Sequence, residues 1–247
     1  MTLPYQGPVA DLPIIMPAHV RQLSVGSLET NCYLLTSPSG VERECIVIDP
    51  GDDGATILKV VRSLNARLAM VCLTHGHADH IGGLPQLLSA YPDCEVAASS
   101  TTLEWLGDPD RNLSTWVGSR LVILPRVTRA LVDGTSFGVG ELRLHAISVP
   151  GHTPGCIAFH LAAADGGPDP AAAVPVLFSG DALFRGTVGR TDLPGGSWAT
   201  LAVSLVALVR QLPAQTLILP GHGQPSSMAW ELENNDYVRQ ALAGGRA

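Results

Sequence analysis

Hydrophobic and polar positions along this chain of 247 residues fall into two halves with the same layout. In each half, short apolar runs typical of β-strands come first, over residues 20–49 and again over residues 141–179. A stretch with apolar residues at helical spacing follows, over residues 55–71 and 197–218. Strands and helices that alternate in this way predict an α/β fold, here with a duplicated arrangement.

Three stretches predict particular helices, and one predicts a loop. Within residues 54–64, apolar side chains recur at i, i+1, i+4 and i+7, which is one face of a helix. A second amphipathic stretch begins after Ser197, a residue type that favours the N-cap position. Residues 230–242 predict one closing helix. Residues 162–173 are low in complexity and lie between two strand-like runs, so they predict a mobile hairpin loop.

Polar side chains follow four of the apolar runs, at the point where each run ends in a glycine-containing turn. The densest of these turns is Thr-His-Gly-His-Ala-Asp-His, at residues 74–80. One histidine or aspartate in such a turn would be a weak signal, because buried strands often end at glycine. Strand ends converge in open α/β sheets, however, and imidazole and carboxylate are the ligands that zinc, manganese and ferrous iron prefer. The candidate ligands of the predicted metal site are His75, His77, Asp79, His80, His152, Asp181 and His222.

Longer matches accompany the histidine motif. They are Asn-Cys-Tyr-Leu at 31–34, Val-Ile-Asp-Pro-Gly at 47–51, and residues 180–196, which begin Gly-Asp-Ala-Leu-Phe and end Gly-Arg-Thr-Asp-Leu-Pro-Gly-Gly. With them the chain resembles the metallo-β-lactamase-fold superfamily from about residue 20 to residue 240, and within it the glyoxalase-II-like (hydroxyacylglutathione hydrolase-like) hydrolases. The resemblance implies a four-layer αβ/βα sandwich with two central mixed β-sheets. It also implies one domain over residues 20–247, after an N-terminal extension over residues 1–19.

The same resemblance implies a role for each candidate ligand. His75, His77 and His152 match the first metal site, Asp79, His80 and His222 match the second, and Asp181 matches the carboxylate that bridges the two ions. Asp79 and Asp181 are the residues expected to matter most for catalysis. Zinc is the first expectation for the two divalent ions, with iron or manganese as alternatives. An aspartate at position 181, where many zinc β-lactamases of this fold carry cysteine, argues against antibiotic hydrolysis.

Three further residues are candidates for contacts around the metals or to substrate. Asp49 follows a predicted strand and is expected to orient a histidine ligand. Arg190 suits a substrate carboxylate, since its guanidinium forms a planar fork. Asp192 lies so close to Arg190 in sequence that mutual pairing is the stronger interpretation of both. The polar segment 108–114 resembles a segment near the active site of short relatives, and an ordinary surface loop explains it equally well.

Two close metals supply a hydroxide near neutral pH, so no protein nucleophile is needed. A thiolate leaves readily because the pKa of a thiol is about 8.5. The resemblance accordingly implies hydrolysis of S-2-hydroxyacyl thioesters such as S-lactoylglutathione. Twenty-five residues follow His222, fewer than the helical C-terminal domain that helps full-length glyoxalase II hold glutathione, so another thiol carrier stays open.

Two alternatives to the hydrolase remain. Persulfide dioxygenases share this fold and the Gly-Arg-Thr-Asp segment, and use one iron, for which His77, His152 and Asp181 would be the matching ligands. Residues 193–196 and 220–223 favour the hydrolase branch. A degenerate member kept only for binding is disfavoured, because no ligand position has been lost.

Composition narrows the partners and the compartment. Hydrophobic residues make up 46% of the chain and charged residues 15%, which allows one large core. The net charge of −7 argues against nucleic acid, and the apolar runs are too short for a membrane span. No signal peptide is expected, and five cysteines without metal-binding spacing indicate buried thiols in a reducing cytoplasm. We therefore expect a cytoplasmic monomer or homodimer that acts on a small-molecule thioester.

Overall fold

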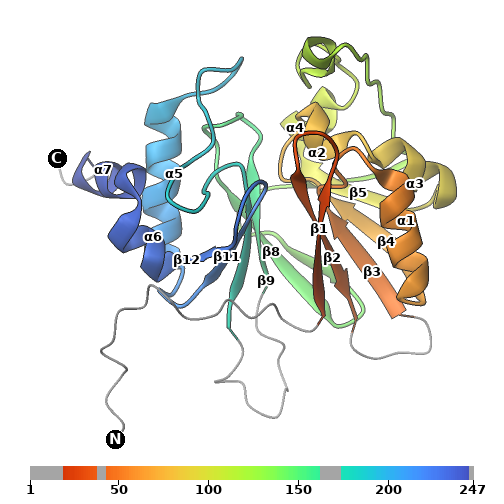
Figure 1. The fold of residues 1–247 in the computed structure, drawn as a ribbon, viewed down its shortest axis with the longest axis horizontal. Coiled ribbons are helices and arrows are strands. Elements are labelled where there is room, and N and C mark those ends of the chain that lie inside the picture. The colour runs from red at the N-terminus through yellow and green to blue at the C-terminus, as the bar shows by residue number, and fades with distance from the viewer. Residues whose placement is uncertain (1–18, 38–42, 162–173, 245–247) are drawn as a thin grey trace, which may run out of the picture.

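The computed structural model describes residues 19–37, 43–161 and 174–244. The predicted hairpin loop at 162–173, and the predicted N-terminal extension except its last residue, lie outside the described residues. Two six-stranded sheets lie face to face at the centre of the described residues, with helices on both outer sides (Figure 1). The predicted α/β sandwich with four layers is therefore confirmed.

The first sheet has the strand order β1-β2-β3-β4-β5-β6. Its strands are β1 (Val20–Val25), β2 (Thr30–Thr36), β3 (Arg43–Ile48), β4 (Ala66–Cys72), β5 (Glu95–Ser99) and β6 (Val127–Leu131). Strands β1 to β3 pair antiparallel, whereas β3 to β6 run parallel. The parallel strands end at one edge, which is where the turn that follows β4 lies.

The second sheet has the order β12-β11-β10-β9-β8-β7. Its strands are β7 (Ser136–Val139), β8 (Leu142–Ser148), β9 (Ile157–Leu161), β10 (Val176–Gly180), β11 (Leu217–Pro220) and β12 (Ser226–Ser227). Only β10 and β11 pair in parallel; the other neighbours are antiparallel. Each half of the chain thus forms its own mixed sheet, as the duplicated pattern predicts.

Helices cover the outer face of each sheet. The helices of the first half are α1 (Gly54–Ser63), α2 (Ala78–Ile81), α3 (Leu84–Ala90), α4 (Ser100–Trp105) and the 3-10 helix η2 (Ser114–Val117); those of the second are α5 (Trp198–Gln211), α6 (Met228–Asn234) and α7 (Asp236–Gly244). As predicted, Ser197 caps α5, since its side chain accepts a hydrogen bond from Thr200 N. The α1 helix is likewise present where the spacing placed it, with Asp53 as its N-cap.

The core has three apolar layers that follow from the alternation of side chains along the strands. The layer between the sheets contains Tyr33 and Phe178, whose ring centroids are 5.1 Å apart. A second layer packs α1 and α3 on the first sheet, and a third packs α5, α6 and α7 on the second. These layers fix the two sheets, and hence the turns at their edges, in one arrangement.

The prediction of one closing helix over residues 230–242 is wrong, because Asn235 divides it into α6 and α7. The Asn235 backbone leaves the helical region at φ −92° and ψ 111°. Its side-chain oxygen accepts hydrogen bonds from Tyr237 N and Val238 N, and its amide nitrogen donates to Thr187 O. The helix is broken because this buried asparagine caps α7 and ties it to a distant loop.

Candidate metal centre

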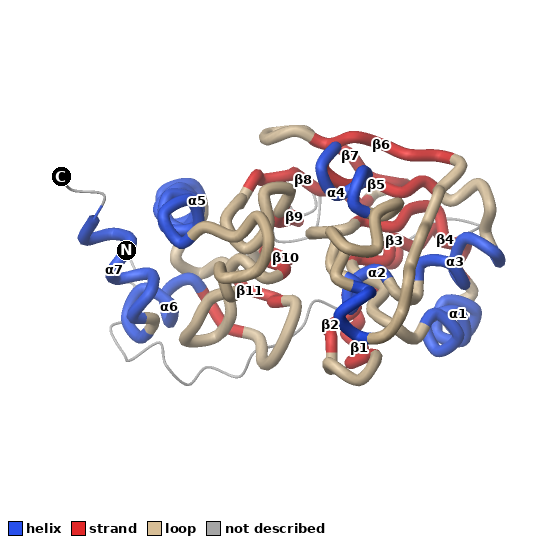
Figure 2. The backbone as a smooth tube through the Cα atoms, turned by 90° about the horizontal axis from the view of Figure 1, so that it is seen from above, coloured by secondary structure: helices blue, strands red, loops and turns tan. Residues whose placement is uncertain are grey.

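Four turns bring the predicted ligands to one end of the two sheets. The turn that follows β4 carries His75 and His77, and the short helix α2 that continues it carries Asp79 and His80. The other three ligands follow strands of the second sheet: His152 comes after β8, Asp181 after β10 and His222 after β11. Seen from above, loops from both halves gather over this end of the molecule (Figure 2). The centre therefore lies on the seam between the two halves.

All seven predicted ligands form one cluster of three overlapping groups. Within each group the candidate ligand atoms lie within 4.8 Å of one another. The groups are His75, His77 and His152; His75, His80 and Asp181; and Asp79, His80 and His222. The first and third groups coincide with the two sets that the resemblance implies, and Asp181 lies between them.

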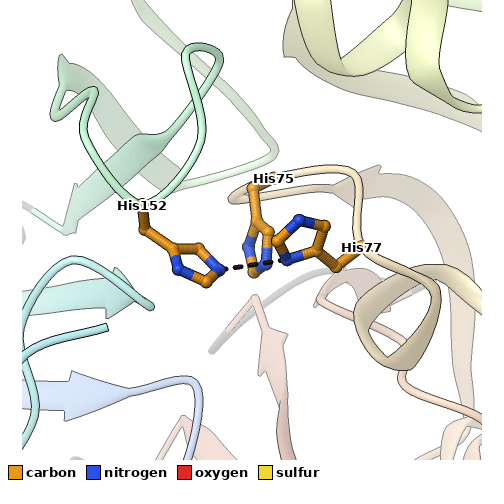
Figure 3. A group of neighbouring side chains, drawn as sticks. All are labelled: His75, His77 and His152. Atoms are coloured by element: carbon orange, nitrogen blue, oxygen red, sulfur yellow. Dashed lines mark hydrogen bonds between the residues drawn. The ribbon is translucent and has the colours of Figure 1, made fainter. Parts of the chain in front are cut away.

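Distances within the cluster suit metal coordination. His77 Nδ1 lies 3.0 Å from His152 Nε2, and Figure 3 shows both rings converging with His75. On the other side, His80 Nε2 lies 3.3 Å from His222 Nε2. Two nitrogens bound tetrahedrally to one zinc at 2.0–2.1 Å are separated by about 3.3 Å, so both spacings fit ligands of a shared ion.

Unsatisfied polar atoms give a second test of the fit. His75 Nε2 and Asp181 Oδ1 are buried and have no hydrogen-bond partner among the described residues. The Asp181 side chain lies 3.3 Å from His80 Nε2 and 3.6 Å from His152 Nε2, between the two groups. Buried polar atoms without partners are costly, and a cation at the centre would satisfy both. The residues present therefore fit divalent metal ions.

Two histidines of the first group, His75 and His77, are held in the neutral form that metals bind. Burial and the neighbouring His152 lower the pKa of His77 to about 3. Burial, followed by the charge of His80, lowers the pKa of His75 well below its ordinary value. Neutral imidazoles keep a lone pair for a metal, so His75 and His77 are ready for coordination at neutral pH.

The second group has a different electrostatic balance. Burial by itself would lower the pKa of His80, but the carboxylates of Asp181 and Asp79 outweigh it and raise that pKa well above the ordinary value. Burial likewise opposes the charged form of Asp181, but the nearby His80 holds the pKa of this carboxyl low. A metal ion bound here would replace a proton on His80, so metal uptake at this group releases a proton.

The outer nitrogen of each histidine is fixed by a hydrogen bond, except for that of His77. His80 Nδ1 contacts Asp49 Oδ2 at 2.9 Å, and His75 Nδ1 contacts the Thr74 hydroxyl at 3.1 Å. Backbone carbonyls accept from the other two: Arg190 O lies 2.7 Å from His152 Nδ1, and Leu28 O lies 3.1 Å from His222 Nδ1. A proton held on Nδ1 leaves Nε2 free to face the centre.

Asp49, the predicted orienting residue, lies in hydrogen-bond contact with a histidine of the cluster. It is 2% exposed and also accepts hydrogen bonds from Thr74 N at 2.8 Å and from the Thr74 hydroxyl at 2.6 Å. Its backbone φ of +49° is in the left-handed region, which is uncommon for residues other than glycine. The strained backbone aims the carboxylate at the turn that carries the ligands.

Arg190 and Asp192 pair with each other. Two hydrogen bonds of 2.7 Å join the guanidinium to the carboxylate, and both side chains are exposed. Arg190 contacts the cluster through its carbonyl, which lies 2.7 Å from His152 Nδ1, and the sequence could not reveal this contact because every residue has a carbonyl. The Leu28 carbonyl was missed for the same reason.

Segments away from the ligand turns support the last ligand. Asn31 Nδ2 and the Tyr33 hydroxyl both donate to Pro220 O, at 3.0 and 2.7 Å. Asn31 also donates to Gly223 O at 2.9 Å, so β2 of the first sheet holds both sides of the His222 turn. The matched segment 31–34 therefore serves to join the two halves at the centre.

The fold and the cluster define a class: an αβ/βα sandwich with a histidine and aspartate centre suited to divalent metals. The family model described as the metallo-beta-lactamase superfamily matches residues 25–222. The chain belongs to this superfamily.

Among curated relatives, the Bacillus subtilis "Probable metallo-hydrolase YqgX" is 30% identical over 219 residues, which cover 88% of this chain and 96% of that protein. The Haemophilus influenzae "Hydroxyacylglutathione hydrolase GloC" is 28% identical over 228 residues, which cover 89% of this chain and 98% of that one. Both matches span nearly the full length of the relative.

Solved structures also match this chain over most of its length. BLEG-1, titled a B3 metallo-beta-lactamase, has a TM-score of 0.77 and 27% identity, with 89% of this chain and 99% of that chain covered. TTHA1623 in a di-iron-bound form has a TM-score of 0.71 and 32% identity, covering 88% and 99%. ETHE1 from Myxococcus xanthus has a TM-score of 0.69 and 26% identity, covering 90% and 84%. The metallo-beta-lactamase fold is what these structures share with the chain.

The described residues include no helix long and apolar enough to cross a membrane. Each of the five cysteines is a buried free thiol.

Proposed function

We propose that this protein is a metal-dependent thioester hydrolase that acts on S-2-hydroxyacyl thioesters of glutathione or another thiol. The observation that carries the proposal is the cluster of seven candidate ligands in overlapping groups. Asp181 lies within 3.8 Å of His152 from the first group and of His222 from the third. We assign His75, His77 and His152 to one ion, Asp79, His80 and His222 to a second, and Asp181 to both. Zinc is the first choice for the ions, with iron or manganese as alternatives.

Two bound ions would supply a hydroxide nucleophile near neutral pH and polarise the thioester carbonyl. The protein's own part is to hold the ligands in the orientation in which they face the ions. Asp49 and the carbonyls of Arg190 and Leu28 hold the outer nitrogens of three histidines. A thiolate leaves without help from a strong general acid. This agrees with the cluster, because its seven titratable side chains are all assigned to metal ions and none is left to act as an acid.

The 28% identity to a protein named hydroxyacylglutathione hydrolase supports the substrate class. Within the proposal, residues 20–247 act as one domain, in the cytoplasm, as a monomer or homodimer, on a small molecule rather than a nucleic acid or a membrane.

The test measures metal content and turnover together. Purified protein is analysed for zinc, iron and manganese, then assayed with S-lactoylglutathione, simple hydroxyacyl thioesters and a β-lactam. The proposal expects close to two ions per chain, thioester turnover, and loss of that turnover in Asp181→Ala. Thioesterase activity retained in Asp181→Ala would overturn it, and so would turnover of the β-lactam alone.

A mononuclear-iron persulfide dioxygenase is the second candidate. His77, His152 and Asp181 form a two-histidine, one-carboxylate set, with His152 Nε2 3.0 Å from His77 Nδ1 and 3.6 Å from Asp181 Oδ2. One iron per chain, with oxygen consumption on glutathione persulfide and no thioester turnover, would establish this function instead.

A further inference from the structure

A strongly basic segment lies within this acidic protein. Residues 111–132 contain four arginines and no aspartate or glutamate, whereas the whole chain carries a net charge of −7. Arg111 pairs with Asp108 at 3.3 Å, and Arg129 pairs with Glu95 at 3.0 Å. The other two, Arg120 and Arg126, are exposed, and no described residue pairs with either of them. The segment therefore presents two uncompensated positive charges to solvent.

The same segment exposes large apolar side chains. Trp116 is 66% exposed, Val117 65%, Val122 57% and Leu124 81%. Single exposed apolar residues are ordinary, but here four lie within nine residues of one segment, a density that suits a binding surface. Trp116 adds a large ring that is free to stack. An occupant of this surface should be anionic and partly apolar.

Hydrogen bonds attach the segment to the metal centre. The Asn112 carbonyl accepts a bond of 2.8 Å from the backbone N–H of Ala78, the residue between His77 and Asp79. The Asn112 side chain donates to Leu121 O at 3.0 Å, which fixes the chain next to Arg120. Figure 1 shows the first part of the segment, the loop that follows α4, above α2 and α4, whereas its last residues form β6. The segment therefore borders the centre at Asn112 and runs outward from it to Arg126, which precedes β6 at the end of the first sheet away from the ligand turn.

We propose that this segment, defined as residues 111–132, binds the carrier half of the substrate, and that the carrier is a phosphorylated thiol of the coenzyme A type. This inference rests on the thioesterase function proposed above. Guanidinium forks match phosphate oxygens, which assigns the carrier's phosphates to Arg120 and Arg126. Trp116 and the exposed aliphatic side chains suit an aromatic base and the apolar arm of such a carrier. Glutathione has neither a phosphate nor an aromatic ring.

The position of the surface favours a substrate over a membrane. A lipid bilayer would also attract arginine, tryptophan and aliphatic side chains. The segment, however, is bonded directly to the turn that carries four candidate ligands, so a thioester held at the metals would extend its carrier along it. A membrane partner would not need that connection.

The experiment compares two substrates with the same acyl group in full-length, metal-loaded protein. One is a lactoyl thioester of coenzyme A and the other is the lactoyl thioester of N-acetylcysteamine, a short neutral thiol. The variant Arg120→Glu/Arg126→Glu should lower the ratio of kcat/KM for the two substrates about tenfold, which corresponds to about 1.4 kcal/mol. The loss should appear in KM for the coenzyme A thioester and shrink as salt is added. The charge-matched variant Arg62→Glu/Arg210→Glu alters exposed arginines on α1 and α5 and should leave the ratio unchanged.

The outcomes separate this inference from the function on which it rests. Turnover of both thioesters with an unchanged ratio in the Arg120→Glu/Arg126→Glu variant overturns the carrier assignment and leaves the thioesterase standing. Failure of the wild type to hydrolyse any thioester overturns the proposed function itself. Sedimentation of the wild type with phosphatidylglycerol vesicles, lost in this variant while the substrate ratio stays constant, assigns the surface to a membrane and overturns the carrier proposal.

Discussion

Asp49→Asn tests whether the carboxylate behind His80 prepares the centre for its second ion. Oδ1 of Asp49 accepts from Thr74 N, whereas Oδ2 accepts from both the Thr74 hydroxyl and His80 Nδ1. Asparagine has one oxygen, so its NH2 group must face one of these donor positions. If it faces His80, the imidazole must accept at Nδ1 and carry its proton on Nε2, which blocks the atom that points to the metal.

The size of the expected loss in zinc affinity follows from the hydrogen bonds that Asp49→Asn removes. Partners of metal-binding histidines are worth about 10–100-fold in metal affinity, which is about 1.4–2.7 kcal/mol. Because Asp49 is 2% exposed, water cannot replace it. We expect Asp49→Asn to weaken binding of one of the two zinc ions by this factor, while the first ion still binds tightly to the His75, His77 and His152 group.

The assay is a zinc titration of chelator-stripped protein against a competing indicator. Asp93→Asn makes the same chemical change at an exposed position and should bind both ions as the wild type does. Thermal unfolding in excess chelator shows whether Asp49→Asn is folded. Two ions bound with wild-type affinity in a folded Asp49→Asn protein would refute the role assigned to this carboxylate.

Other predictions concern pH, close packing and the junction between the halves. Because the pKa of His77 is about 3 in the folded protein and about 6.5 when unfolded, the unfolded state binds more protons between these values. Metal-free wild type should therefore lose more stability than His77→Ala as pH falls from 6.5 towards 4 in urea titrations; equal losses would contradict this. A Cβ at Gly221 would lie 2.2 Å from Asp181 Oδ1, so Gly221→Ala should lose metal in elemental analysis, whereas Gly244→Ala, with open space around it at the end of α7, should keep both ions. Tyr33→Phe should lower the free energy of unfolding by about 1 kcal/mol in urea, and no change would show that its 2.7 Å hydrogen bond contributes nothing.

The sequence predicted the parts of the site whose chemistry is carried by side chains at strand ends. His152 and His222 are 70 residues apart, yet both follow strands of the second sheet, and strand ends converge. Asp49 was predicted as an orienting group because it too follows a strand. These inferences needed only residue type and hydrophobic pattern.

The features that the sequence did not predict depend on tertiary contacts or on local charge. The apolar spacing continues through Asn235, so the pattern could not show that this residue would leave the helix to bond Thr187 O. Whole-chain charge concealed the basic segment at 111–132, because the acidic residues lie elsewhere. A net charge describes the average surface, whereas recognition depends on the charges that lie together.

The centre lies between the two halves of the chain, and this position affects the stability of the protein in the cell. One half contributes the turn at residues 74–80, and the other contributes His152, Asp181 and His222. Ions bound to both sets would act as a cross-link between the sheets that only the native state offers. Stability then grows with the free metal concentration as RT ln(1 + [M]/Kd), about 2.7 kcal/mol at a hundredfold excess over Kd. A cell short of metal would therefore lose this protein to proteolysis as well as losing its activity, and its abundance would report the metal supply.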